Sequence, residues 1–297
     1  MEFNKLQLMR STEYVLFENI KVRQPTLAEL AEFTEGNDGF DKFMLMVNAI
    51  SLRPIDIADI LWVENKILYT DFASPWEFFI SRAFTEGQDI VVTEEFEGQT
   101  LSSNAHCANI VVEEALNYFF NKTGHYIFIT DNKNKQEEDK PIVYLMNIGE
   151  DGIITDNAFK FTEVLYHLLV EFLNIITWND GVPLFMRELK SKNAGVDVKI
   201  GNKRLLKALL ENAYKKRNSK HKSSVTFDSI VSALIAEQHN SEQIWNFPLY
   251  LVYDQYHRVN KIKVYSETMA ALNSGCYDTK KHPINWEKID WASVITL

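Results

Sequence analysis

The sequence predicts a mainly α protein with a small β element, made of an α+β N-terminal part and an all-helical C-terminal part. Apolar residues recur with helical spacing along most of the 297-residue chain, and β-type alternation is confined to short stretches of its first half. Hydrophobic residues make up 46 % of the chain and aromatic residues 12 %, enough for a sizeable core. We expect the two parts to be residues 1–157 and 158–297.

Strands open the chain and helices follow. Residues 14–24 alternate and are rich in β-forming side chains, which predicts one or two short strands. Thr26 then predicts a helix start, with Glu29 as its capping-box partner. The spacing of apolar residues predicts further helices at 40–50, at 55–63 and from Pro75 onward.

The middle of the chain predicts a small α+β patch. Residues 85–105 are polar and weakly patterned, which indicates a loop with a short strand at 90–93. A helix is predicted at 110–120. It is followed by a strand pair at 126–130 and 142–146.

From residue 157 onward the pattern is almost wholly helical. A broad apolar stripe over 161–176 is typical of a buried helix. The remaining predicted helices run from Asn202 to Arg217, from Thr226 or Phe227 to about Gln238, and over 247–273, the last capped by Asn246 and ended by Gly275.

The charge is unevenly distributed. Residues 187–222, here called the basic belt, hold twelve Lys or Arg and three Asp or Glu, a net charge of +9 in a chain of net charge −10. Such a belt suits nucleic acid, but Tyr214 is its one aromatic residue, and the acidic remainder would repel a duplex. Pairing within the protein, or contact with another protein, is the favoured interpretation.

A cluster of aromatic residues begins the last predicted helix: Trp245, Phe247, Tyr250, Tyr253 and Tyr256. Core packing is the default interpretation of such a cluster. The alternative is an interface, because Tyr and Trp dominate binding hot spots.

No motif for catalysis, a cofactor or a metal is present in the sequence. There is no phosphate-binding glycine loop, and the seven histidines lack zinc-type spacing. Cys107 beside His106 is interpreted as a buried thiol next to a surface histidine, and adjacent glutamates such as Glu113 and Glu114 as solvated surface. We therefore expect no enzyme, no cofactor and no metal ligands.

Three features of the sequence indicate the cellular compartment. The N-terminus lacks the apolar run of a signal peptide, and two cysteines fit a reducing cytosol. The longest apolar stretch, 164–176, is too short and too polar to span a bilayer. We expect a soluble intracellular protein without membrane contact.

Several short segments of the sequence resemble a known protein family. In the first half they are residues 20–33 (IKVRQPTLAELAEF), 53–62 (RPIDIADILW) and 76–79 (WEFF). In the second half they are residues 186–189 (MREL), 229–233 (SIVSA), 244–250 (IWNFPLY), 254–258 (DQYHR) and 273–275 (NSG), then Lys280, Lys281, Trp286 and Trp291. The pattern resembles tail assembly chaperones of tailed bacteriophages that infect Gram-positive hosts. It covers 15–84 and 158–292, and 85–157 is interpreted as an insertion.

The resemblance implies a non-enzymatic, mostly helical factor in the cytoplasm of the infected host cell. Such chaperones coat the tape-measure protein, recruit tail-tube subunits and are absent from the finished particle. We also expect self-association. The residues expected to contact other proteins are Trp245, Tyr250, Tyr253 and Arg258, with Lys203, Arg204, Lys207, Lys215, Lys216 and Arg217 of the basic belt.

Two other functions stay open at this point. One is a structural baseplate or tail-hub component of the phage particle. The other is a nucleic-acid-binding regulator or anti-defence protein that uses the basic belt.

Overall fold

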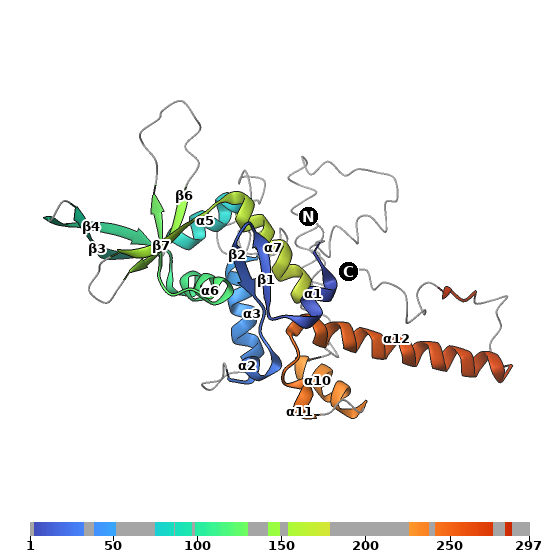
Figure 1. Ribbon diagram of the computed structural model, residues 1–297. Coiled ribbons are helices and arrows are strands. Elements are labelled where there is room, and N and C mark those ends of the chain that lie inside the picture. The colour runs from blue at the N-terminus through green and yellow to red at the C-terminus, as the bar shows by residue number, and fades with distance from the viewer. Residues whose placement is uncertain are drawn as a thin grey trace, which may run out of the picture.

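The computed structural model describes residues 3–32, 39–51, 75–85, 87–96, 99–129, 142–148, 154–178, 226–237, 241–275 and 283–286. Figure 1 shows a five-stranded sheet at one end of this part of the chain, a helical body in the middle and a long helix, α12, at the other end. The mainly α class is confirmed. The predicted helices at 55–63 and 202–217, and the basic belt, lie outside the described residues.

The N-terminal segment forms a short helix and a hairpin. Helix α1 (Lys5–Arg10) begins at Asn4, whose side chain accepts hydrogen bonds from two backbone N–H groups of the first turn. Strands β1 (Glu13–Phe17) and β2 (Ile20–Arg23) pair antiparallel, as predicted. Alternation buries every second side chain of β1 against the body.

The capping box at the next helix is confirmed. The Glu29 N–H donates to Thr26 Oγ1 at 3.2 Å, and the Thr26 N–H donates to Glu29 Oε2 at 2.9 Å. This pair begins α2 (Leu27–Glu32). Helices α3 (Gly39–Ile50) and α5 (Pro75–Thr85) follow as expected and bury one apolar side each.

The antiparallel sheet has the order β3-β4-β5-β6-β7. Its strands are β3 (Gln88–Phe96), β4 (Gln99–Cys107), β5 (His125–Ile129), β6 (Ile142–Ile148) and β7 (Ile154–Phe161), and α6 (Ile110–Phe120) connects β4 to β5. The predicted helix at 110–120 and the predicted strand pair are thus confirmed.

The short strand predicted at 90–93 lies within β3, but the prediction of a loop for the rest of 85–105 is wrong. Strands β3 and β4 form a hairpin whose pairing runs from Gln88 opposite Cys107 to Phe96 opposite Gln99. Backbone hydrogen bonds hold this hairpin together and do not require apolar side chains. The polar composition of the segment therefore gave no indication of two paired strands. Gly87 is required where β3 begins, because a Cβ there would lie 2.1 Å from the Cys107 carbonyl oxygen.

Strand β7 corrects the expectation that the chain is wholly helical from residue 157. The strand pairs with β6 through Phe161, so the predicted boundary between the two parts falls within β7. Thr162 then caps α7 (Glu163–Ile176) by accepting the Leu165 N–H, and α7 buries the predicted apolar stripe.

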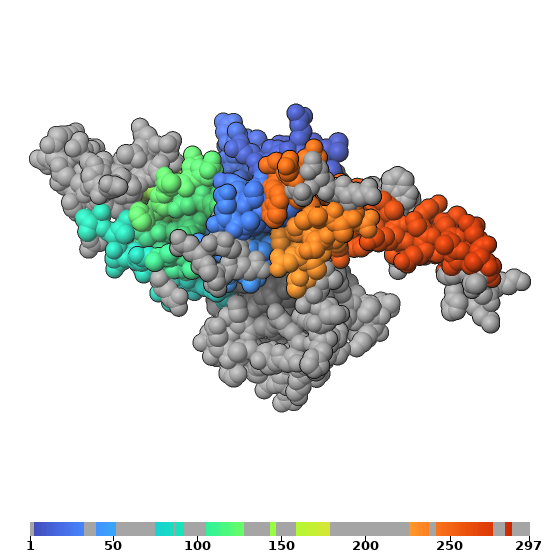
Figure 2. All heavy atoms as spheres, turned by 90° about the horizontal axis from the view of Figure 1, so that it is seen from below, coloured from blue at the N-terminus to red at the C-terminus, as the bar shows by residue number. Residues whose placement is uncertain are grey.

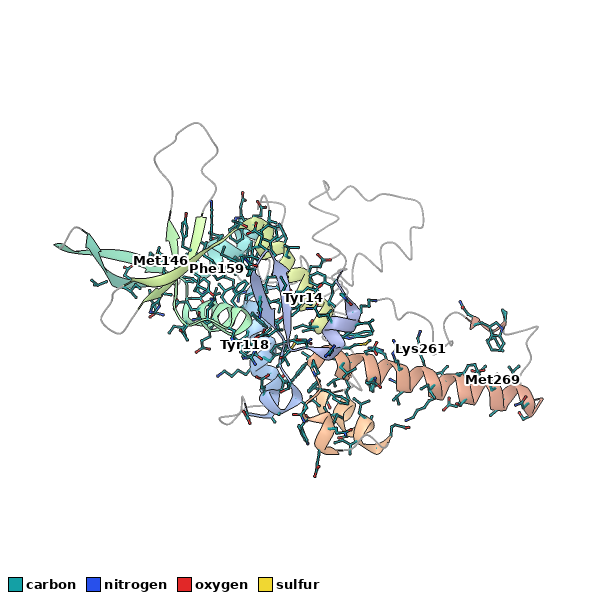
Figure 3. The ribbon with its side chains drawn as sticks, viewed as in Figure 1. Tyr14, Tyr118, Met146, Phe159, Lys261 and Met269 are labelled. Carbon is teal, nitrogen blue, oxygen red and sulfur yellow. The ribbon has the colours of Figure 1, made fainter. Side chains whose placement is uncertain are left out.

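One hydrophobic core runs through both predicted parts. It includes Leu8 and Phe43 from the first part and Phe172 and Leu249 from the second, all fully buried. Figure 3 shows Tyr14 and Tyr118 within the helical body between the sheet and α12. The two parts therefore share a core in the described structure.

The C-terminal helices are α10 (Phe227–Ala236), α11 (Ser241–Ile244) and α12 (Leu249–Asn273). Thr226 caps α10 as predicted, and Gly275, at φ +71°, follows the end of α12. Asn246 does not cap α12: its N–H donates to the Gln243 carbonyl in the turn that ends α11, and Pro248 is the residue before α12. Within the described residues, no helix combines the length and apolarity needed to cross a membrane.

Candidate functional site

Helix α12 is capped by a residue far away in the sequence. Pro248 offers no side-chain cap, and the Tyr250 N–H instead donates to Gln24 Oε1 at 3.0 Å. Gln24 Nε2 donates to the carbonyl oxygens of Leu8 and Ser11 at 2.8 and 2.9 Å. Because Gln24 is buried, one side chain joins α1, the end of β2 and the first turn of α12.

Backbone hydrogen bonds reinforce this junction. The Leu249 N–H donates to the Pro25 carbonyl at 2.9 Å, and the N–H groups of Leu27 and Ala28 donate to the carbonyls of Phe247 and Trp245. The start of α2 and the entry to α12 thus satisfy each other's free backbone groups. The base of α12 is anchored in the body.

A buried ion pair lies one turn further along α12. Arg258 donates from Nε to Asp254 Oδ2 at 2.7 Å, and from its terminal nitrogen to Oδ1 at 3.3 Å. The Asp254 side chain is 4 % exposed and that of Arg258 is 31 % exposed. A two-point contact of this kind holds the carboxylate where water does not reach it.

Trp178 covers the same stretch of α12. This residue follows α7 in the left-handed region, at φ 52°, which is uncommon for a side chain of its size. Its ring stacks on His257 with a centroid distance of 4.4 Å and on Tyr250 at 5.9 Å. The end of α7 and the base of α12 therefore pack through aromatic rings.

The stacked histidine predicts a pH dependence. Burial lowers the pKa of His257; the Asp254 carboxylate raises it and Lys261 lowers it. The folded pKa thus lies below the unfolded value of about 6.5, so the unfolded state binds the proton first as the pH falls. We expect the free energy of unfolding to decrease below about pH 6.5, and less so in His257→Phe, which keeps a stacking ring.

Urea unfolding at a series of pH values measures this difference. The control is His167→Phe, because the His167 side chain is 51 % exposed on α7. Equal pH profiles for His257→Phe and the wild-type protein would contradict the prediction.

The residues expected to contact partners have different environments. Trp245 is 41 % exposed, whereas Tyr250 is 2 % exposed. Tyr253 packs on Phe227 at 6.0 Å, and burial raises its pKa. The core interpretation therefore holds for Tyr250. Contact with a partner stays a prediction for Trp245, Tyr253 and Arg258.

The six belt residues named as contacts, Lys203, Arg204, Lys207, Lys215, Lys216 and Arg217, lie outside the described residues. Their role stays a prediction.

Beyond its base, α12 extends away from the body. Lys263 pairs with Glu237 at the end of α10, with 2.5 Å between Nζ and Oε1. Residues 261–273, here called the α12 arm, include this contact near their start and continue past it, as Figures 1 and 2 show. Figure 3 shows Lys261 and Met269 along this stretch.

The arm carries a regular apolar stripe. Ile262, Tyr265, Met269 and Leu272 follow one another at steps of three, four and three residues, which places them on one side of the helix. Ile262 is 44 % exposed. The spacing of these residues can be read from the sequence, but only the structure shows that this length of α12 leaves the body.

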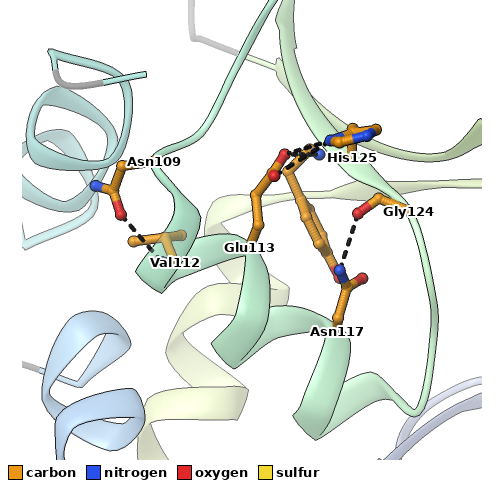
Figure 4. A network of polar contacts seen from close by, with 7 residues as sticks. Asn109, Val112, Glu113, Asn117, Gly124 and His125 are labelled. Atoms are coloured by element: carbon orange, nitrogen blue, oxygen red, sulfur yellow. Dashed lines mark hydrogen bonds and ion pairs between the residues drawn. The ribbon is translucent and has the colours of Figure 1, made fainter. Parts of the chain in front are cut away.

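A second polar cluster lies at the sheet. Glu113, on α6, was expected to be solvated, but its side chain is 10 % exposed. Figure 4 shows its carboxylate against His125, whose Nδ1 lies 3.2 and 3.3 Å from the two carboxylate oxygens. The Tyr126 N–H donates to Glu113 Oε1 at 3.0 Å. Burial raises the pKa of Glu113, and these two contacts oppose the rise.

The turn before His125 is held in place by α6. Asn117 Nδ2 donates to the Gly124 carbonyl at 2.9 Å, as drawn in Figure 4. Asn121 ends α6 in the left-handed conformation, at φ 49°. The hydrogen bond and the turn at Asn121 together position the first residue of β5 beside the first turns of α6.

Cys107 belongs to this cluster and His106 does not. Cys107 is fully buried, and burial raises the pKa of its thiol to about 12. The His106 side chain is 44 % exposed and contacts Asp89 and the Phe84 carbonyl. The predicted buried thiol beside a surface histidine is confirmed, because adjacent side chains of a strand point to opposite faces.

Cys107, Glu113 and His125 together could hold a metal ion. One ligand atom from each lies within 4.8 Å of the others. The sequence does not reveal this set, because its members are not arranged in any metal-binding motif. The expectation that Glu113 is solvated is wrong.

Comparison with known protein families finds a similarity in the C-terminal region. Residues 216–296 match the family model of the YomV second domain, a Bacillus phage-type protein family. The match supports a phage-associated protein, and the matched range contains α10, α11 and all of α12. No curated protein and no solved structure matches the chain.

Proposed function

We propose that this chain is a non-enzymatic phage tail assembly factor that binds the tape-measure and tail-tube proteins while the particle is built. The observation that carries the proposal is the α12 arm. It begins on an anchored base and extends away from the body (Figure 1). Its stripe consists of the exposed Ile262 and the half-buried Tyr265, Met269 and Leu272. The match to a phage-type family covers the whole arm.

The stripe suits a helical partner. Apolar residues at alternating steps of three and four are the pattern with which one helix packs along another. A long helical client such as the tape-measure protein offers many equivalent positions for such a contact. Short contacts of this kind are weak singly and strengthen when several act together.

The base of α12 contributes by holding the arm's direction. Gln24, the Asp254–Arg258 pair and the Trp178 stack attach the first turns to the body, so less freedom is lost when the arm binds. The proposal does not depend on the basic belt, whose part in binding stays a separate prediction.

The test is a pull-down of the full chain with the tape-measure and tail-tube proteins encoded in the same genome. Ile262→Glu with Met269→Glu places two charges on the stripe and keeps good helix formers. We expect wild-type protein to retain at least one of the two proteins, and the double variant to lose at least about tenfold in affinity, because charges in a desolvated contact are costly.

The matched control is Val264→Glu with Ala271→Glu. It adds the same two charges at the same separation on the opposite side of the arm, and Val264 is itself 46 % exposed. The control should bind like the wild type. Failure of the wild-type protein to retain either protein would sink the proposal. An equal loss of affinity in both double variants would show that the stripe is not the binding surface.

A further inference from the structure

We propose that Cys107, Glu113 and His125 form a binding site for one divalent transition-metal ion, with zinc as the ion that this ligand set favours. The site lies at the sheet end of the described structure, away from the α12 arm, and does not depend on the proposed function. A thiolate, an imidazole and a carboxylate are the three kinds of side chain that bind zinc in proteins.

Three elements supply one ligand each. Cys107 ends β4, Glu113 lies in the first turn of α6, and His125 begins β5. Cys107 pairs directly with Ile127, so Cys107 and His125 lie on the same face of the sheet. The Ala108 N–H, which donates to the Tyr126 carbonyl at 2.8 Å, holds the two strands together at this point.

The distances require only a small contraction. The three ligand atoms lie within 4.8 Å of one another. Tetrahedral zinc with bonds of about 2.0–2.3 Å places its ligand atoms roughly 3.5 Å apart. The 3.2 Å between His125 Nδ1 and Glu113 Oε2 is already close to that separation. Movement of the Cys107 side chain by about an ångström completes the set.

An outer shell for the carboxylate is also in place. The Tyr126 N–H donates to Glu113 Oε1, which orients the carboxylate before any ion binds. Hydrogen bonds to ligating side chains have this role in protein metal sites. Asn117 holds the Gly124 carbonyl and thereby the position of His125.

The charge of the three ligands and the solvent access of the site both suit a divalent cation. Cys107 and Glu113 are buried, and among the described residues the basic side chain paired with Glu113 is His125. An ion bound by a thiolate and a carboxylate has its two charges balanced, and the thiol proton is released to solvent. The His125 side chain is 41 % exposed, so the site opens on one side and a water molecule can complete four ligands.

Cobalt(II) titration of the full chain under reducing conditions, after treatment with a chelator, tests the site. Cobalt takes the place of zinc in S, N and O sites and absorbs in the visible and near-ultraviolet when a thiolate binds it. We expect about one cobalt ion per chain, with a thiolate charge-transfer band, displaced by one equivalent of zinc. Metal analysis of the purified protein should detect bound zinc, at no more than one ion per chain.

Four variants make the result specific. Cys107→Ser should abolish the charge-transfer band, and His125→Ala should weaken cobalt binding by about tenfold or more. Cys276→Ser keeps Cys107 and removes the other thiol, and His167→Ala removes an exposed histidine; both should bind as the wild type does. His125 is partly exposed, so its variant keeps the test valid if Cys107→Ser fails to fold.

Two outcomes would overturn the site. One is a wild-type protein that shows no saturable cobalt spectrum. The other is a spectrum that survives Cys107→Ser and disappears with Cys276→Ser, because the thiolate would then come from another place.

Discussion

Gln24→Leu is expected to lower the free energy of unfolding by about 3 kcal/mol, because two buried backbone groups and one partly buried group lose their hydrogen-bond partner. These groups are the carbonyls of Leu8 and Ser11 and the N–H of Tyr250. Leucine has a similar size, so the loss comes from unpaired polar groups and not from a cavity. Urea unfolding followed by circular dichroism measures it.

The matched control for this change is Gln243→Leu. Gln243 is an exposed residue of α11, so the same substitution there should change the free energy of unfolding by no more than about 0.5 kcal/mol. A Gln24→Leu protein as stable as this control would show that the junction does not hold the base of α12.

Arg258→Met is expected to lower the free energy of unfolding by about 2–3 kcal/mol, because it leaves the Asp254 carboxylate buried without its partner. Methionine keeps most of the apolar length of the arginine side chain. We place the value below the upper end of the range for buried pairs because the Arg258 side chain is 31 % exposed. Thermal and urea unfolding measure it.

Lys263→Met is the control on the same helix. It removes the same charge from the Lys263–Glu237 pair, whose side chains are 52 and 40 % exposed, and should change the free energy of unfolding by less than about 1 kcal/mol. Similar losses in the two variants would mean that burial of Asp254 does not decide the strength of its pair.

The Gln24→Leu variant also separates folding from binding. Gln24→Leu weakens the base of α12, and Ile262→Glu with Met269→Glu alters the arm. Below its unfolding transition, Gln24→Leu should retain the tape-measure or tail-tube protein better than the arm variant does. Partner binding would then follow the stripe and not overall stability.

Local chemistry explains which elements could be predicted. Thr26 with Glu29, Thr226 with the Ser229 N–H, and Gly275 each act within one turn of a helix. Apolar spacing likewise located α3, α6 and α7, because each helix buries one side. Asn246 failed as a cap because the turn that ends α11 uses its N–H.

The parts of the fold that the sequence did not predict are strands that depend on pairing with another segment. The hairpin of β3 and β4 forms from a polar segment, and β7 was hidden in a stretch that reads as helical. A strand is stabilised by its neighbour, and the neighbour of β7 is β6, across residues 149–153. Side-chain pattern within one segment does not contain that information.

For the candidate sites too, some features are visible in the sequence and others only in the tertiary structure. The apolar stripe of the arm is visible in the sequence, because its period is that of a helix. That the stripe leaves the body is a property of the tertiary structure, as is the cap that Gln24 provides to α12. The sequence alone determined the mainly α class, most helix ends and the apolar sides, since these follow from contacts within a few residues. Folding alone decided that Cys107, Glu113 and His125 meet and that Tyr250 is enclosed, because both depend on elements brought together from distant positions along the chain.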